Sequence, residues 1–264
     1  MKIDKQLAAV VTGGASGLGR ASAEALAESG MKVAIFDVNE DGGKAVADSI
    51  DGLFCKVDIT SEESVVAGYD AARAAHGQER VLVHCAQISK GGKTVRYDKA
   101  TGGYVRYSTE DYAFSAQGIL IASYRLASLS ALGMANAEPL NADGERGTII
   151  LTASAAAQDA QVGQVGYGSL KAGVNGLVLP MARDLMDVGI RVNSIMPGIF
   201  ATPPMLAVKD RAPAIFDGLA ASVPFPKRLG HPEEFGSLVL ELVRNGYFNG
   251  QSLRLDGAIR MPPK

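Results

Sequence analysis

The stretch TGGASGLG, Thr12–Gly19, stands between an apolar run that begins at Leu7 and an amphipathic segment, Arg20–Ser29. Glycines at positions 13, 17 and 19 would let the backbone turn tightly and approach an anion without collision with a side chain. A helix that begins at this turn presents free N–H groups and the positive end of its dipole to that anion. A strand, a glycine-rich turn, a helix and a second strand in this order predict a dinucleotide-binding unit.

Apolar runs recur along the rest of the chain and alternate with helical patterns. Seven of these runs are expected to be strands: 7–12, 32–37, 53–56, 81–85, 147–151, 190–195 and 252–255. Most are short, rich in Val, Ile and Leu, and apolar on both faces, as in strands that helices cover from both sides. The alternation predicts one α/β domain over residues 1–264, with a doubly wound parallel sheet.

Two segments are expected to be irregular. Residues 89–110 carry many glycines and charges, and residues 201–228 contain five prolines. Both would follow the carboxyl ends of strands, where open α/β sheets bind their ligands. Because long loops in compact domains are often binding loops, the stretch 201–228 is the expected substrate loop.

The second expected strand ends at Asp37, 18 residues after Gly19. A carboxylate at this position can bind both hydroxyls of an adenosine ribose, and it repels the additional phosphate of NADP. A pair of unit charges about 4 Å apart is worth roughly 1 to 4 kcal/mol between bulk water and a partly shielded surface. Positions 16 and 38, where a Lys or Arg could bind the additional phosphate of NADP, are occupied by Ser16 and Val38. Asp37 therefore predicts NAD as the cofactor.

A serine, a tyrosine and a lysine follow the fifth expected strand at a spacing that suits proton transfer. Ser154 comes after that strand, and Tyr167 and Lys171 share one face of a helix. A tyrosine with a pKa of about 10 is a poor base at neutral pH, and lowering that pKa by ~3 units takes about 4 kcal/mol. An ammonium group about 4 Å away supplies roughly that amount. We expect Tyr167 as acid or base, Lys171 as its activator, and Ser154 as the group that orients the reacting oxygen.

Composition and charge argue against several other classes of function. The formal net charge is −2 and there is no long basic run, so we expect no nucleic-acid partner. No stretch reaches the roughly 18 continuous apolar residues of a membrane span, and the N-terminus is a poor secretion signal. Two cysteines and three scattered histidines predict neither a disulfide framework nor a metal site. We therefore expect a cytoplasmic protein without a bound metal.

Taken together, these motifs resemble the short-chain dehydrogenase/reductase family over nearly the whole chain. The resemblance rests on TGGASGLG, Asp37, Asp58-Ile59-Thr60, Ser154, YGSLK at 167–171, and Pro197-Gly198 followed by Thr202. It implies a Rossmann-like sheet of seven strands with helices on both faces, and hydride transfer between a nicotinamide and a carbonyl or hydroxyl carbon.

The resemblance also implies individual contacts with the cofactor. Asp58 and Ile59 would contact the adenine, and Thr202 the nicotinamide carboxamide. Lys171 would hold the nicotinamide ribose. The cofactor-binding residues implied in this way are Gly13, Ser16, Gly17, Leu18, Gly19, Asp37, Asp58, Ile59, Cys85, Ala86, Gln87, Tyr167, Lys171, Pro197 and Thr202.

The second half of the chain is similar to one branch of that family, the type II 3-hydroxyacyl-CoA dehydrogenases. The similarity is carried by AAAQDAQVGQVGYGSLK, GIRVNSIMPGIFATP, VPFPKRLGHPEEF and NGQSLRLDGAIRMPPK. It implies a small-molecule substrate, a secondary alcohol or ketone such as an acyl-CoA derivative, with Gln161, Gln164 and Phe200 beside Ser154 in the pocket. The family resemblance also implies a homotetramer, with the Tyr167 helix and the preceding long helix in its main interface.

Two positions depart from the family pattern. Where the family has Asn-Asn-Ala-Gly or Asn-Cys-Ala-Gly, this chain has HCAQ at 84–87, and Gln87 adds a side chain that we expect to shift the loop. The family's asparagine on the next helix, which holds a water beside the catalytic lysine, corresponds to Ser115 when the chain is aligned on Gly118. A shift of one residue would place Ala116 there instead. Ser115 is the fourth predicted catalytic residue, with one donor where an amide has two.

The complete set of Ser154, Tyr167 and Lys171 favours an active NAD-dependent oxidoreductase. The alternative is an NAD-binding homologue with weak or lost catalysis that acts as a sensor or scaffold, which Gln87 and the missing asparagine favour. Reduction of a 3-oxoacyl carrier protein usually goes with NADP and fits badly with Asp37.

Overall fold

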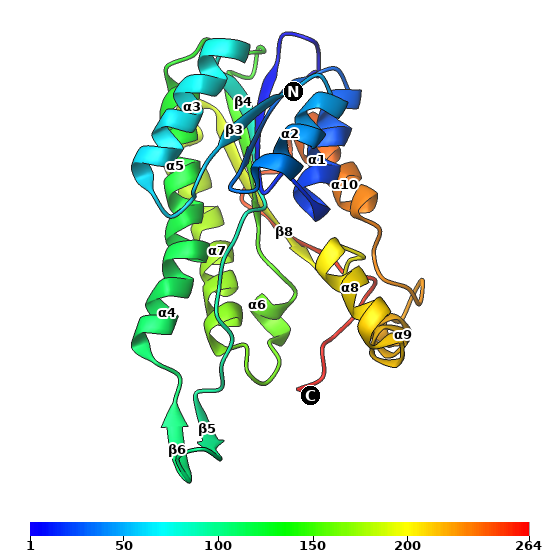
Figure 1. The fold of residues 1–264 in the computed structure, drawn as a ribbon. Helices are drawn as coiled ribbons and strands as arrows, with labels where there is room; N and C mark the ends of the chain where they lie inside the picture. Colours follow the sequence, from blue (N-terminus) through cyan, green and yellow to red (C-terminus); the bar gives the residue numbers. More distant parts are fainter. Residues whose placement is uncertain (264) are drawn as a thin grey trace.

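The computed structural model describes residues 1–263 and shows a seven-stranded parallel sheet between two layers of helices (Figure 1). The strand order is β3-β2-β1-β4-β7-β8-β9. The strands are β1 (Ala8–Thr12), β2 (Lys32–Asp37), β3 (Leu53–Lys56), β4 (Glu79–His84), β7 (Gly147–Thr152), β8 (Ile190–Pro197) and β9 (Ser252–Leu255). The predicted fold class is confirmed, and every predicted strand lies within two residues of the observed bounds. Lys264, the end of the predicted domain, lies outside the described residues.

Each face of the sheet has its own hydrophobic core, because successive side chains of a strand point to opposite faces. The first face is covered by α3 (Glu62–His76), α5 (Ala122–Ala135) and α7 (Val165–Asp184); the second is covered by α1 (Gly17–Glu28), α2 (Glu40–Ser49) and α10 (Pro232–Arg244). Val10 of β1 packs in the first core, and its neighbours Ala9 and Val11 pack in the second. A short 3-10 turn, η2 (Met186–Val188), links α7 to β8.

The direction of chain progression reverses between β1 and β4. The chain passes outward from β1 to β2 and β3, then returns to place β4 on the other side of β1. In open α/β sheets such a reversal leaves a crevice at the carboxyl ends of the strands, where ligands bind. The residues that follow β1, β4, β7 and β8 are therefore brought to one edge of the sheet.

The prediction of an irregular segment over residues 89–110 was wrong in part. Its centre is an antiparallel hairpin, β5 (Val95–Asp98) and β6 (Gly103–Arg106), which projects from the body of the domain (Figure 1). Tyr97 and Tyr104 face each other across the hairpin, with ring centroids 5.5 Å apart in an edge-to-face arrangement. These strands are only four residues long and mostly charged or exposed, so they lack the apolar pattern that would have identified them.

The expected substrate loop, 201–228, is also largely helical. It contains α8 (Pro203–Arg211) and α9 (Pro213–Ser222), each of which has a proline in its first turn. Proline suits that position, because its fixed φ matches the helix and its missing N–H would have no helical partner there. Two of the five prolines thus begin helices, although the number of prolines had predicted an irregular loop over residues 201–228.

One helix is long and apolar enough to meet a simple criterion for crossing a membrane. It is the continuous run of α4 (Thr109–Ala116), the π-helical turn η1 (Gln117–Ile121) and α5, with a mean hydropathy of 1.4 in its most apolar window. Half of that window is buried in the domain. Buried residues of α5 such as Leu126 pack against the sheet, which is the behaviour of a core helix.

Candidate active site

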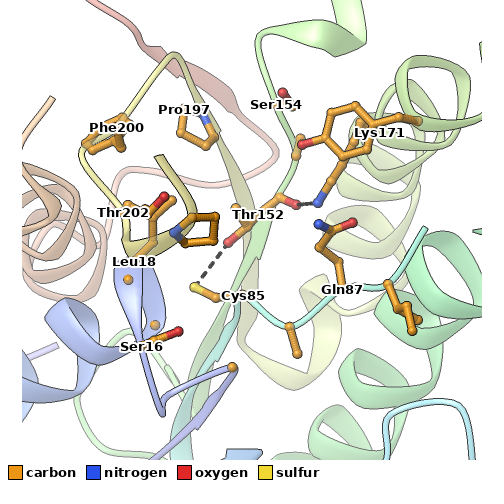
Figure 2. A pocket seen from close by; sticks show the side chains of 18 of the residues that line it. Ser16, Leu18, Cys85, Gln87, Thr152, Ser154, Lys171, Pro197, Phe200 and Thr202 are labelled. Atoms are coloured by element: carbon orange, nitrogen blue, oxygen red, sulfur yellow. Dashed lines mark hydrogen bonds between the residues drawn. The ribbon is translucent and has the colours of Figure 1, made fainter. Parts of the chain in front are cut away.

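A cavity of about 1060 Å³ opens at the carboxyl ends of β1, β2, β4, β7 and β8. Every residue predicted to bind cofactor or substrate lines this cavity. Figure 2 shows how side chains from distant parts of the chain, among them Ser16, Cys85, Lys171 and Thr202, surround it. Among the predicted catalytic residues, Ser154, Tyr167 and Lys171 lie on its wall and Ser115 does not.

At Gly13 and Gly19 the glycine-rich turn at one end of the cavity has no space for a side chain. Gly13 has a φ of +68°, and a Cβ atom there would lie 2.8 Å from the amide nitrogen of Ala86. A Cβ atom on Gly19 would collide with the carbonyl oxygen of Gly13. Ser16 precedes α1 in an extended conformation, and its side chain does not cap the helix. The N–H groups of the first turn of α1 are therefore available to an anion such as a pyrophosphate.

Asp37 is held in place at the end of β2 beside this turn. Its two carboxylate oxygens accept hydrogen bonds from the backbone N–H groups of Ala15, at 3.1 Å, and Asn39, at 2.9 Å. Asp58 and Ile59, which follow β3, line the same part of the cavity. The carboxylate is thus oriented by backbone groups before any ligand binds, and its negative charge faces the cavity.

Ser154, Tyr167 and Lys171 meet at the cavity wall from β7 and α7. Ser154 is 6% exposed and its Oγ accepts a hydrogen bond from the N–H of Ala156 at 3.1 Å. Lys171 is 4% exposed, and its Nζ donates to the carbonyl oxygen of Thr152 at 2.6 Å (Figure 2). The same Nζ lies 5.8 Å from the centre of the Tyr167 ring. A hydroxyl, a phenol and an ammonium group therefore converge where a reacting oxygen can be bound.

Known proteins similar to this chain share both its length and its fold. A family profile described as enoyl-(acyl carrier protein) reductase matches residues 13–259. The 3-hydroxyacyl-CoA dehydrogenases type-2 of Homo sapiens and Drosophila melanogaster are each 40% identical to it over 98% of this chain, and over 97% and 99% of their own lengths. A crystal structure of 3-hydroxyacyl-CoA dehydrogenase type-2 from Mycobacterium avium has a TM-score of 0.89 and 39% identity, with all of both chains covered.

The chain belongs to the short-chain dehydrogenase/reductase family. Membership makes it an oxidoreductase that uses a nicotinamide cofactor. The residues present fit such a cofactor, since the glycine turn leaves room for a pyrophosphate and Asp37 stands where an adenosine ribose would lie. No group of three or more His, Cys, Asp or Glu side chains able to hold a metal ion occurs within residues 1–263.

The electrostatics of the short-chain dehydrogenase site differ from the expectation that Lys171 lowers the pKa of Tyr167. Burial raises the pKa of Tyr167, and the Ser154 hydroxyl opposes this shift. Burial lowers the pKa of Lys171 to about 8. Tyr167 therefore keeps its proton at neutral pH and is prepared to donate it. A phenolate forms there when the ammonium group of Lys171 is close enough to stabilise it.

His84, where the family pattern has asparagine, takes part in a buried hydrogen-bond network. Its Nδ1 lies 2.7 Å from the Oγ1 of Thr12, and that oxygen also accepts the N–H groups of Cys85 and Ala86. The hydroxyl proton of Thr12 is thus left for His84 Nδ1, which places the ring proton on Nε2. Burial lowers the pKa of His84 to about 3, with the Lys171 charge adding to the effect. A neutral His84 therefore fixes the backbone that faces the glycine turn.

Gln87, the second departure in that motif, extends into the cavity beside Lys171 (Figure 2). The backbone after it is held by the π-helical turn η1, because the carbonyl of Gly118 accepts the N–H of Ile88 at 3.3 Å. π-helical turns often occur at functional sites. The extra side chain thus changes the lining of the cavity at a loop that remains attached to the helix.

Ser115 does not line the cavity, and its predicted role in holding a water beside Lys171 stays a prediction. It is completely buried, and its Oγ accepts the N–H of Lys90 at 3.0 Å and donates to the carbonyl of Asp111 at 2.9 Å. The hydroxyl of Tyr107 lies 3.3 Å from the same atom. Ala116, the other alignment considered, does not line the cavity either. Ser115 holds the base of the β5–β6 hairpin.

Several wall residues were missed by the sequence analysis. The additional residues include Val38, Thr60, Phe114, Thr152, Met205, Leu219 and Met261. Thr60 is the last residue of the quoted motif Asp58-Ile59-Thr60, and Val38 and Thr152 lie within two residues of Asp37 and Ser154, so proximity in sequence could have identified all three. Met205 and Leu219 come from α8 and α9, outside every quoted motif, and Met261 belongs to the C-terminal stretch NGQSLRLDGAIRMPPK without having been named as a site residue.

Proposed function

We propose that this protein is an NAD-dependent dehydrogenase that interconverts a secondary alcohol and a ketone, with 3-hydroxyacyl-CoA thioesters as its substrate class. The observation that carries the proposal is the convergence of Ser154, Tyr167 and Lys171 in a cavity that also contains the glycine turn and Asp37. A bound nicotinamide would accept or supply the hydride.

The three side chains would handle the oxygen and its proton. Ser154 and Tyr167 donate hydrogen bonds to the ketone oxygen, which orients the carbonyl and stabilises the negative charge that grows on it. In the reductive direction Tyr167 transfers its phenolic proton to that oxygen, and in the oxidative direction its phenolate takes the proton from the alcohol. Lys171, buried at the carbonyl of Thr152, offsets the phenolate charge.

Asp37 supports NAD over NADP as the cofactor. Two backbone N–H groups fix its carboxylate toward the cavity, so an additional phosphate on the adenosine ribose would meet a negative charge that cannot turn away. Fluorescence titration of the purified protein should show tighter binding of NADH than of NADPH. Equal affinities would contradict the assignment.

The substrate class is supported by the relatives and by the lining of the cavity. Three of the similar proteins carry 3-hydroxyacyl-CoA dehydrogenase type-2 as their name. The cavity that contains Ser154 is also lined by polar Gln161 and Gln164 and by apolar Phe200 and Met205, which suits a thioester carbonyl followed by an aliphatic chain. NADH production should be screened with 3-hydroxyacyl-CoA thioesters, hydroxysteroids and simple secondary alcohols. Activity confined to a class other than the thioesters would contradict the substrate assignment.

A catalytically silent NAD-binding protein is not favoured. Ser154, Tyr167 and Lys171 line one cavity in a chain that carries the changes at Gln87 and Ser115. The similar proteins at 40% identity are named as dehydrogenases. The substrate screen also tests this alternative, because a silent protein would bind NADH and turn over none of the three classes.

We further propose a homotetramer located in the cytoplasm. Large apolar side chains are exposed along the two helices expected in the interface, including Tyr124 and Leu132 on α5 and Leu179 on α7. Cys55 and Cys85 are both unpaired, which suits a reducing compartment. Sedimentation velocity of the protein and fractionation of the source cells test the two statements, and a monomer or a membrane-bound fraction would contradict them.

A further inference from the structure

The C-terminal segment, residues 256–263, continues past β9 to the stretch that follows α6 (Ala156–Asp159) and contributes Met261 to the cavity wall. In Figure 1 it descends from β9 between α6 and the α8–α9 pair. The carbonyl of Pro262 accepts a hydrogen bond from Gln161 Nε2 at 3.2 Å. The carbonyl of Pro263 accepts the N–H of Val162 at 3.0 Å. The segment is thus attached to the stretch of chain that supplies the predicted substrate residues.

Arg254 fixes the other end of this segment. Its guanidinium group binds the carboxylates of Asp159, at the end of α6, and Asp256, each at 2.6 Å. It also donates to the carbonyl of Ile259 at 2.9 Å, and Ile259 is 1% exposed. Hydrogen bonds between charged groups are roughly twice as strong as neutral ones, and the planar fork of arginine sets their direction. The segment therefore has a defined position relative to α6.

Of the described residues in this segment, Met261 alone lines the cavity. Phe200, Met205 of α8 and Leu219 of α9 are other apolar residues that line the same cavity. Methionine is unbranched and polarisable, so it can adapt to aliphatic groups of different shape. The neighbouring Arg260 has a side chain that is 62% exposed and is not part of the wall.

We propose that Met261 is a specificity-determining residue whose side chain limits the length of aliphatic chain that the cavity accepts, with Arg254 as its positioning residue. The inference deepens the proposed function and rests on it. A single methylene group in a hydrophobic pocket changes the specificity constant by roughly 10-fold to 200-fold. Replacement of Met261 by a smaller or larger side chain should therefore change the ranking of substrates that differ only in chain length.

The test compares kcat/KM of the tetrameric enzyme for 3-hydroxyacyl-CoA thioesters of increasing chain length. Met261→Ala should raise the ratio of long-chain to short-chain kcat/KM by roughly tenfold, and Met261→Phe should lower it. Arg260→Ala is the matched control in the same segment and should keep the parental ratio. NADH affinity should stay within about twofold in all three variants. An unchanged ratio in both Met261 variants overturns the inference.

A second measurement does not need turnover. The chain contains no tryptophan, so Met261→Trp and Arg260→Trp each introduce a single tryptophan, whose emission can be excited selectively. Addition of a long-chain acyl-CoA together with NAD should shift the emission of Met261→Trp and leave that of Arg260→Trp unchanged. If the parent enzyme oxidises no thioester, the proposed function is wrong. The emission of Met261→Trp then still tests whether position 261 lies beside the bound acyl chain. An unshifted emission of Met261→Trp overturns the inference.

Discussion

The two ends of the cavity are built in different ways. The cofactor end is built around one continuous strand–turn–helix unit, Ala8–Glu28, and is completed by Asp37 and by residues at the carboxyl ends of β3, β4 and β8. The substrate end is assembled from α8, α9, the C-terminal segment and the stretch after α6. The cofactor end is close-packed and requires glycine at defined positions, whereas many apolar side chains could line the substrate end. A site can thus combine a part that tolerates almost no substitution with a part open to variation.

The largest expected effect is at the boundary between the two ends. Tyr167→Phe removes the proton donor without changing the ring that packs there, so turnover should fall by about 10²-fold to 10⁴-fold. NADH binding should remain within about twofold, because the phenol oxygen is needed for chemistry. Steady-state kinetics and NADH fluorescence titration measure the two quantities. A variant that retains its turnover would remove Tyr167 from the proposed mechanism.

Gly19→Ala tests the intolerance of the cofactor end. The added Cβ would collide with the carbonyl of Gly13, so the turn must open and NADH affinity should fall by roughly tenfold or more. Gly176→Ala, in α7, is the matched control, since a Cβ there meets no atom within 4 Å. Titration with NADH checks both variants. Equal affinities in the two would show that the turn is less tightly packed than the structure indicates.

Asp37→Ala should change the choice of cofactor without disturbing the substrate end. Loss of the carboxylate removes the repulsion of the additional phosphate and the hydrogen bonds to the ribose, so the preference for NADH over NADPH should narrow by roughly tenfold. The ranking of substrates by chain length should be unchanged. The preference ratio is measured by titration with each cofactor, and a ratio that equals the parental one would contradict the role of Asp37.

The smallest effect on turnover is expected for Ser115→Ala. Since Ser115 holds Lys90 at the base of the hairpin and does not reach the cavity, turnover should change by less than about threefold. Hydrogen exchange in residues 93–106 should become faster, because a buried contact at the base of the hairpin is lost. Loss of turnover by the factor expected for Tyr167→Phe would support the predicted catalytic role of Ser115.

Local patterns predicted the sheet and most of the cavity, because each pattern depends on residues that are close together in the sequence. The alternation of strands and helices, the glycine turn and the spacing of Tyr167 and Lys171 each lie within about one structural unit. The β5–β6 hairpin was not predicted, because its strands are short and exposed and lack an apolar pattern. Ser115 was placed beside Lys171 by alignment, whereas the structure turns it toward Lys90 and Tyr107.

The sequence by itself determined the family, the positions of the seven strands and the cofactor end, whereas the order of the strands came from the structure. Glycine at position 13 and an acid at position 37 are requirements of local geometry and charge. The family resemblance had suggested Gln161, Gln164 and Phe200, whereas only the tertiary structure showed that Met205, Leu219 and Met261 also line the cavity. Met261 reaches the cavity because Arg254 and the stretch after α6 hold the C-terminal segment there, through contacts between residues about 95 positions apart.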